Sequence, residues 1–318
     1  MNQLQQFSLD KSLLPKGKIQ TIGIVGCGRV GQDVALHSAR FGMDVVFIEI
    51  SNERIKEIFK KLEEQLDNVI AHWGITLSEK RLVLSRIKGS TSYKELRFCN
   101  LVIETISSRS EGTMIEERQE IFQKIEAVVN EKAIISSNLA TLMISDLATV
   151  LKHPGRAIGI HFIDPIGKAD IVELVKGVRS TDDAYNKARR FVKLIGKKAI
   201  KVNESPGNIS IRMIVPFINE ACEILMEGVA TVEDIDETMR ESSGHRTGPF
   251  ELADRIGLDK VMKYMDNLYA EFGNSKYKAS PVIKRLVRAN YLGRLNGKGF
   301  YNYEGSKPVS NISFTIIN

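Results

Sequence analysis

Residues 21–49, TIGIVGCGRVGQDVALHSARFGMDVVFIE, decide the fold of this chain. An apolar run at 22–25 leads into the glycine turn 26–31, GCGRVG, and a segment of helical period then leads to a second apolar run at 45–48. Strand, glycine turn, helix and strand in this order predict the start of a doubly wound α/β domain that binds a dinucleotide. Glu49 ends the second run 23 positions after Gly26, near the spacing of about 20 that a ribose contact requires.

The glycines of the turn have separate physical tasks. Gly26 permits the tight turn, Gly28 lets the backbone approach a pyrophosphate, and Gly31 lets the helix pack closely on the strand. The diphosphate then lies on free N–H groups at the positive end of the helix dipole. Glu49 would accept hydrogen bonds from a ribose diol and repel a 2′-phosphate, which favours NAD over NADP. A plain strand-to-helix connection without a cofactor is the alternative for this pattern.

We therefore expect a set of cofactor-binding residues in the turn and at the ends of the neighbouring strands. Its members are Gly26, Gly28, Arg29, Val30, Gly31, Glu49 and Glu104. Within this set Glu104 ends a later predicted strand, 101–104. Arg29, inside the turn, is either a solvated side chain or an additional phosphate contact.

The composition is that of a globular protein with two domains. A chain of 318 residues is long for a single core, and its contents of 43% hydrophobic and 26% charged residues are ordinary. The net charge of +6 comes with dispersed lysines and no clustered basic face, so we expect no nucleic-acid partner.

The cysteines and the apolar runs exclude further classes. Three separated cysteines without a C-x-x-C pair argue against a disulfide framework or a zinc site, and we expect no metal. No apolar run approaches the length of about 18 residues that a membrane-spanning helix needs. Residues 1–18 also lack the apolar core of a signal peptide, so we expect a cytoplasmic protein that does not bind membranes.

Predicted strands and helices alternate to about residue 203, which indicates a doubly wound, mostly parallel sheet. A helical hairpin, with arms at 53–72 and from 78 onward, is inserted in this Rossmann-type domain. Ser-Pro-Gly at 205–207 marks the boundary, and helices are predicted beyond it at 209–227, 232–242, 257–272 and 281–289. We expect an N-terminal tail at 1–18, an NAD-binding domain at 19–203, an all-α dimerisation and substrate domain at 204–303, and a C-terminal tail at 304–318.

The predicted helix 209–227 is apolar on more than one side. This pattern suits the interface of a homodimer, although a helix in the core of a domain would look the same.

Of the five histidines, only His161 ends a predicted apolar strand, at the edge where an open sheet carries its chemistry. Glu173 lies twelve residues later, in the predicted strand 171–175. A carboxylate on an apolar face must be paired, and His161 is its natural partner if the two strands are neighbours. Such a pair would hold the imidazole in one tautomer for acid–base chemistry. A satisfied core histidine and a separately paired glutamate are the alternative that spacing alone leaves open.

Nine short motifs follow one another in an order that no common unrelated fold shares. They are GCGRVG at 26–31, RIKGST at 86–91, SSN at 136–138, GIHFIDP at 159–165, VELVKG at 172–177, SPGN at 205–208, EGVATVEDID at 227–236, GHRTGPFEL at 244–252 and GRLNGKGFYNY at 293–303. Over residues 19–303 the chain resembles the NAD-dependent L-3-hydroxyacyl-CoA dehydrogenase family. The resemblance implies a nucleotide domain, a helical dimerisation domain, His161 as general base and Glu173 as its orienting partner. The base would take the proton of a 3-hydroxyl while C3 gives a hydride to the nicotinamide.

Several positions depart from the pattern of the family. Polar or otherwise typical residues are replaced by Ser108, Ala140, Asp164, Ile211, Arg246-Thr247 and Leu295. Removing one donor to a developing oxyanion typically costs about 2.7–4 kcal/mol, so the pocket is either rebuilt for another substrate or less active. We expect Asn138, Asn208 and Arg246 to contact the substrate, with Asn208 replacing the amide lost at Ile211.

Three functions are compatible with these residues. The first is NAD-dependent oxidation of a (3S)-3-hydroxyacyl-CoA, or its reverse, by a homodimeric enzyme of fatty acid metabolism. The second is oxidation of a small free hydroxy acid of the gulonate or carnitine type, whose carboxylate Arg246 would bind; an exposed loop arginine is the plainer interpretation of that residue. The third is an NAD-binding protein without catalysis.

Overall fold

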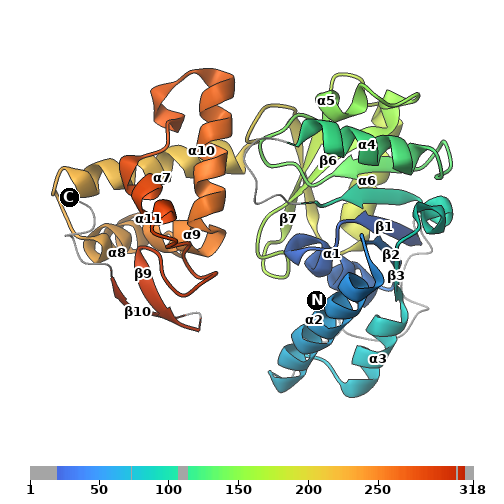
Figure 1. Ribbon diagram of the computed structural model, residues 1–318, viewed down its shortest axis with the longest axis horizontal. Coiled ribbons are helices and arrows are strands. Elements are labelled where there is room, and N and C mark those ends of the chain that lie inside the picture. The colour runs from blue at the N-terminus through green and yellow to red at the C-terminus, as the bar shows by residue number, and fades with distance from the viewer. Residues whose placement is uncertain (1–19, 73, 107–113, 306, 312–318) are drawn as a thin grey trace. The chain divides into compact units, whose positions relative to one another are not determined.

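The computed structural model describes residues 20–72, 74–106, 114–305 and 307–311, which form two compact units (Figure 1). The first unit contains the described residues up to Glu204, and the second contains those from Ser205 onward. The Ser-Pro-Gly run that we interpreted as a boundary therefore begins the second unit.

The first unit is built on an eight-stranded sheet with the order β3-β2-β1-β4-β5-β6-β7-β8. All neighbouring strands of this sheet are parallel except β6 and β7, which are antiparallel. The predicted mostly parallel sheet is therefore confirmed. The strands are β1 (Thr21–Val25), β2 (Asp44–Ile48), β3 (Ile87–Ser90), β4 (Leu101–Glu104), β5 (Ile134–Ser137), β6 (Ala157–Phe162), β7 (Ile171–Lys176) and β8 (Lys198–Asn203).

Helices cover both faces of this sheet, which is the doubly wound arrangement. The helices are α1 (Arg29–Arg40), α2 (Asn52–Ala71), α3 (Leu77–Ser85), α4 (Ile115–Glu126), α5 (Ile144–Ala148) and α6 (Asp182–Leu194). One apolar cluster joins α1, α2 and α6 to the sheet, and a second cluster joins α4 and α5 to it. Because neighbouring side chains of a strand point to opposite faces, Ile24 of β1 belongs to the first cluster and Val25 to the second.

The predicted helical hairpin is present as α2 and α3 (Figure 1). In α2 the side chains of Ile58, Leu62 and Leu66 are buried, which is the spacing of one helix face. The helix α3 begins with a capping box in which Thr76 and Glu79 satisfy each other's backbone N–H groups. Trp73, in the predicted loop between the two arms, lies outside the described residues.

The second unit is mostly helical, and two of its features were not predicted. Its elements are α7 (Ser210–Met226), α8 (Val232–Ser243), α9 (Pro249–Ile256), α10 (Leu258–Phe272), α11 (Pro281–Arg288), β9 (Tyr301–Glu304) and β10 (Lys307–Asn311). The helix α9 lies between the predicted helices 232–242 and 257–272, and its first turn carries the helix-start signals Pro249 and Glu251. The helical C-terminal domain is confirmed, and β9 and β10 add to it an antiparallel hairpin that the sequence analysis did not predict.

Two buried carboxylates, Asp236 and Asp254, join the segments near the end of this unit. Asp236 accepts hydrogen bonds from two backbone N–H groups in the first turn of α9, at 2.8 and 2.9 Å, and so caps that helix. Asp254 accepts them from the N–H groups of Phe300 and Tyr301, at 2.9 and 3.0 Å. The hydroxyl of Tyr301 donates back to Asp236 at 3.0 Å. The motif at 293–303 therefore holds the second unit together.

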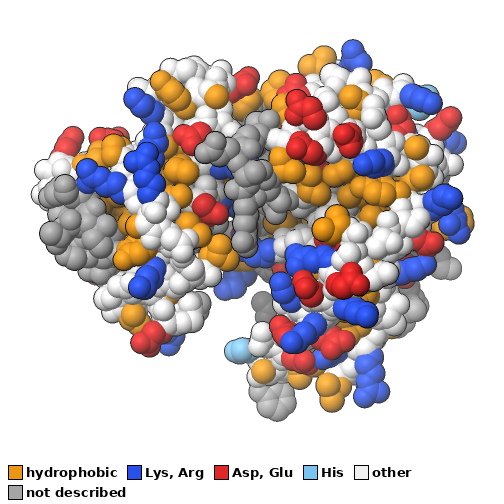
Figure 2. Space-filling view, in the orientation of Figure 1, with side chains coloured by type: hydrophobic (Ala, Val, Ile, Leu, Met, Phe, Trp, Pro, Cys, Tyr) orange, Lys and Arg blue, Asp and Glu red, His pale blue; other side chains and the backbone are white. Residues whose placement is uncertain are grey.

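On the face of the first unit drawn in Figure 2, basic and acidic side chains are interspersed. No single basic surface of the kind that nucleic acids require is seen on that face. In the part of the chain that the structure describes, every helix is too short or too polar to cross a membrane.

Candidate active site

The antiparallel pairing of β6 and β7 places His161 directly opposite Glu173. The two side chains are 6% and 3% exposed, and Nδ1 of the imidazole lies 2.7 Å from Oε2 of the carboxylate. The predicted pairing is thus confirmed. An ionised carboxylate can only accept hydrogen bonds, so Nδ1 carries the hydrogen and Nε2 presents a lone pair. Among the described residues, Nε2 has no hydrogen-bond partner.

Asn138 connects this pair to the next strand of the sheet. It follows β5 directly, and its Oδ1 accepts a hydrogen bond from the backbone N–H of Phe162 at 3.0 Å. Its own N–H donates to the carbonyl of Glu104 at 2.9 Å. Because Oδ1 is used by the backbone, the two N–H donors of the side chain are left for a ligand. Asn138 therefore lies beside His161, where we expected a substrate contact.

The glycine turn has the geometry that a dinucleotide needs. Gly26 has a φ of +83°, a conformation that favours glycine, and it begins the tight turn. A Cβ on Gly31 would lie 2.7 Å from the carbonyl oxygen of Gly26 and 2.8 Å from the hydroxyl of Thr105, so only glycine lets α1 approach the strand this closely. Gly28 caps α1 without a side-chain hydrogen bond, which leaves the N–H groups of the first turn available to an anion. Val30 packs partly buried against the core, so its side chain points inward.

Glu49 lies at the carboxyl end of β2, against the same turn. Its Oε1 accepts a hydrogen bond from the N–H of Cys27 at 2.7 Å, and Oε2 accepts one from the N–H of Ile50 at 3.3 Å. The carboxylate is thus held beside the turn, where the ribose of a dinucleotide would lie. Turn, helix and carboxylate together fit NAD.

Glu104 is placed differently from the other expected cofactor residues, because its side chain is fully buried. Arg118 of α4 forms an ion pair with it, Ser137 donates a hydrogen bond to it, and the N–H of Ile106 donates another at 2.5 Å. Burial raises the pKa of Glu104, and the neighbouring guanidinium of Arg118 opposes that rise. The carboxylate is engaged within the protein, so a contact of Glu104 with the cofactor stays a prediction. Ser108 lies outside the described residues.

An ion pair that sequence reasoning missed joins the turn to the segment after His161. Arg29, at the first position of α1, pairs with Asp164, and the two side chains are 57% and 27% exposed. Asp33, one helical turn further along α1, lies close to both groups. Burial and the charge of Asp164 raise the pKa of Asp33 to about 6, while Arg29 opposes the shift.

The remaining candidates belong to the second unit. Asn208 is buried with a φ of +48°, and Ile211 is buried on α7. Arg246 is exposed after the end of α8. The arginine that follows Ile211, Arg212, donates to the hydroxyl of Ser205 at 3.0 Å and stacks on an aromatic ring of α10. Leu295 is also exposed. The roles of Asn208 and Arg246 stay predictions.

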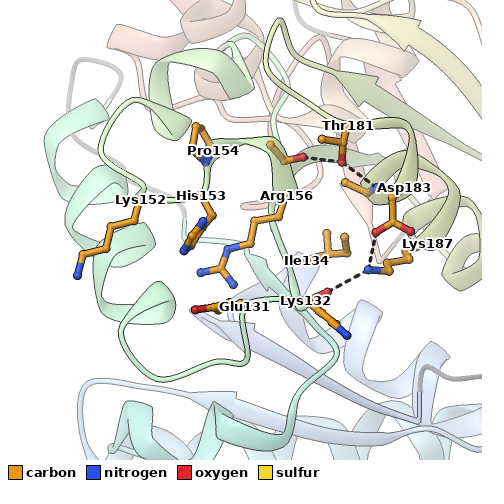
Figure 3. Close-up of a pocket in the computed structure, with 12 residues that line it drawn as sticks. Glu131, Lys132, Ile134, Lys152, His153, Pro154, Arg156, Thr181, Asp183 and Lys187 are labelled. Carbon is orange, nitrogen blue, oxygen red and sulfur yellow. Dashed lines mark hydrogen bonds and ion pairs between the residues drawn. The ribbon is translucent and has the colours of Figure 1, made fainter.

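A cavity of about 400 Å³ lies elsewhere in the first unit (Figure 3). Its lining comes from the segments that precede β5 and β6 and from the start of α6, that is, from the opposite edge of the sheet to His161. Arg156 there is bound to Glu126 at 2.9 Å, and Lys187 is bound to Asp183 at 2.6 Å. Within the described residues, no group of three or more His, Cys, Asp or Glu side chains could hold a metal ion.

Comparison with known protein families matches nearly the whole chain. Residues 21–205 match the NAD binding domain of 3-hydroxyacyl-CoA dehydrogenase, and residues 207–303 match the C-terminal domain of the same enzyme.

Curated relatives and solved structures agree with this result. The chain is 35% identical over 291 residues to a 3-hydroxybutyryl-CoA dehydrogenase of Bradyrhizobium diazoefficiens, covering 92% of this chain and 98% of the relative. It is 33% identical to a probable 3-hydroxybutyryl-CoA dehydrogenase of Bacillus subtilis, covering 90% and 98%. Among solved structures, (S)-3-hydroxybutyryl-CoA dehydrogenase PaaH1 from Ralstonia eutropha is similar with a TM-score of 0.81 and 37% identity, covering 90% of this chain and 99% of that one. FadB2 of M. tuberculosis is similar with a TM-score of 0.86 and 29% identity, at the same coverage.

Proposed function

The chain belongs to the 3-hydroxyacyl-CoA dehydrogenase family and is an NAD-dependent oxidoreductase, and from this premise we propose that His161 and Glu173 convert a (3S)-3-hydroxyacyl-CoA to the 3-oxoacyl-CoA, or the reverse. The observation that carries this proposal is the buried imidazole–carboxylate pair at the carboxyl edge of β6. Since the curated relatives are named 3-hydroxybutyryl-CoA dehydrogenases, a four-carbon acyl group is the first substrate to test.

In the oxidative direction, Nε2 of His161 accepts the proton of the 3-hydroxyl. The imidazole becomes positively charged in that step, and Glu173, 2.7 Å from Nδ1, stabilises the charge and keeps the ring in the reactive orientation. Both side chains are shielded from water, so the interaction is little weakened by solvent. NAD, when bound, accepts the hydride that leaves C3.

Asn138 supplies a donor on the substrate side of this pair. Its Oδ1 is held by the N–H of Phe162, so its N–H donors are oriented away from the backbone. We expect them to bind the oxygen on C3, where negative charge develops as the proton leaves.

The test is a spectrophotometric assay with acetoacetyl-CoA and NADH, in which loss of absorbance at the nicotinamide band reports turnover. Turnover that His161→Ala abolishes, while NADH still binds by fluorescence, supports the proposal. Turnover with free hydroxy acids alone, lost in Arg246→Ala, would assign the protein to carboxylate substrates instead. Binding of NADH without turnover of either class would leave a protein that only binds the cofactor.

The helix α7 supports a homodimer. Ile209 and Met213, four residues apart at its start, are 50% and 70% exposed in the isolated chain, and a second copy would bury them. Light scattering on the purified protein gives the mass directly, and a monomer at micromolar concentration would contradict this part of the proposal. A role in the fatty acid metabolism of the cytoplasm stays a prediction from the sequence.

A further inference from the structure

Three charged side chains meet between the dinucleotide turn and the loop after the catalytic histidine. Arg29 comes from the turn, Asp33 from the second turn of α1, and Asp164 from the loop 163–170 between β6 and β7. Arg29 and Asp164 form an ion pair although they are 135 positions apart in the chain. Asp164 lies three residues after His161.

The cluster contains more negative than positive charge. Two carboxylates face one guanidinium, and the repulsion between Asp33 and Asp164 is one cause of the raised pKa of Asp33. At neutral pH the three groups together carry one net negative charge. A carboxylate pair of this kind opposes the approach of a further anion.

The surplus of negative charge matters because Arg29 lies where the cofactor diphosphate is expected. Arg29 is the only charged residue in the turn 26–31, and it begins the helix whose N-terminus is the expected place of the cofactor diphosphate. It is therefore the cation that the turn offers to the phosphates, and Asp164 already binds it.

The ion pair can open without releasing the loop that carries Asp164. At the other side of this loop, Nζ of Lys197 donates hydrogen bonds to the carbonyl oxygens of Ile166 and Ala169, both at 2.6 Å. These contacts hold the loop independently of Arg29. The guanidinium is more than half exposed, so it can turn from the carboxylate to a phosphate.

We propose that Asp164 sets the affinity of the protein for its dinucleotide, because its carboxylate competes with the cofactor diphosphate for the guanidinium of Arg29. The inference rests on the proposed use of the turn for NAD, but it is independent of which substrate is oxidised.

The experiment is a fluorescence titration of the full-length protein with NADH. Asp164→Asn keeps the shape of the side chain and removes its charge, and the dissociation constant should fall about two- to fivefold, the range of an exposed ion pair. The gain should shrink between ionic strengths of about 0.01 M and about 1 M, because salt screens the competing charge. Asp170→Asn is the matched control, since it removes one charge from the same loop, at a position where the backbone carbonyl accepts a hydrogen bond from the N–H of Lys198 at 2.8 Å.

A double-mutant cycle separates competition from simple repulsion. In the Arg29→Ala background, Asp164→Asn should raise NADH affinity less than it does when Arg29 is present, because no guanidinium is left to compete for and only the repulsion of the diphosphate is relieved. Weaker or unchanged binding in the Asp164→Asn single variant would overturn the proposal. So would an equal gain in the Arg29→Ala background or in Asp170→Asn. The titration needs no substrate, so a failure to turn over acetoacetyl-CoA would contradict the proposed function and leave this test valid.

Discussion

Replacing Glu173 with glutamine tests whether its charge, and not only its shape, supports the reaction. Glutamine has nearly the same size as glutamate, and the β6–β7 pairing that places residue 173 opposite His161 depends on the backbone. The substitution therefore leaves an uncharged amide close to the imidazole. If Glu173 stabilises the ring as it gains a proton, the chemical step must slow.

The size of the effect follows from the geometry. The contact of 2.7 Å joins two groups that are 6% and 3% exposed, so solvent screens it little. A hydrogen bond to a charged group contributes about 1.5–3 kcal/mol, and each 1.4 kcal/mol of barrier is about a tenfold change in rate. We expect kcat of Glu173→Gln to fall about 10- to 100-fold.

The measurement is kcat in the oxidative direction, at saturating (3S)-3-hydroxybutyryl-CoA and NAD, together with the dissociation constant of NADH and a thermal unfolding curve. Cofactor binding and the unfolding temperature should stay close to those of the unmodified protein. His161→Ala is the reference, and the double variant should be no slower than His161→Ala, because the carboxylate acts through the imidazole. A kcat within twofold of the unmodified protein would refute the assigned role of Glu173.

Three further predictions test the turn and the pH dependence of stability. Glu49→Ala should reduce the ratio of the NADP to the NAD dissociation constant, because the carboxylate that repels the 2′-phosphate is gone. An unchanged ratio would show that Glu49 does not determine the preference for NAD. Gly31→Ala should weaken NADH binding more than about tenfold, since its Cβ would meet the carbonyl of Gly26 at 2.7 Å, whereas Gly167→Ala, with nothing within 4 Å, should bind normally. Burial lowers the pKa of His37 from 6.5 to about 4, and its Nε2 donates to the carbonyl of Ile195 at 2.9 Å. The unfolded chain therefore takes up the proton first, and stability should be lost as pH falls from 6.5 towards 4; urea unfolding of His37→Gln should show a smaller loss, and an equal one would exclude His37 as its source.

Much of the candidate site could be predicted because its parts are encoded in short stretches. The turn 26–31 needs glycine for reasons of local geometry, and Glu49 follows at a distance set by one helix and one strand. The strands that carry His161 and Glu173 were likewise visible as apolar runs. The sequence did not show that these two strands are neighbours. The antiparallel pairing of β6 and β7 shows that they are.

Other features depend on contacts between distant residues. The pairing of Arg29 with Asp164 and the burial of Glu104 against Arg118 leave no periodic signal, because any surface arginine has the same local pattern. In the second unit, α9 was hidden in a segment rich in turn residues, and its cap, Asp236, lies on a different helix.

By itself, the sequence determined the order of strands and helices in the first unit, the dinucleotide turn and the two residues expected to do the chemistry. These follow from backbone preferences and from the periodic burial of apolar side chains, which act over a few residues. The tertiary structure alone decided which charged groups face one another. That choice depends on the order of strands in the sheet and on the packing of helices over it, and ion pairs contribute too little free energy to determine either.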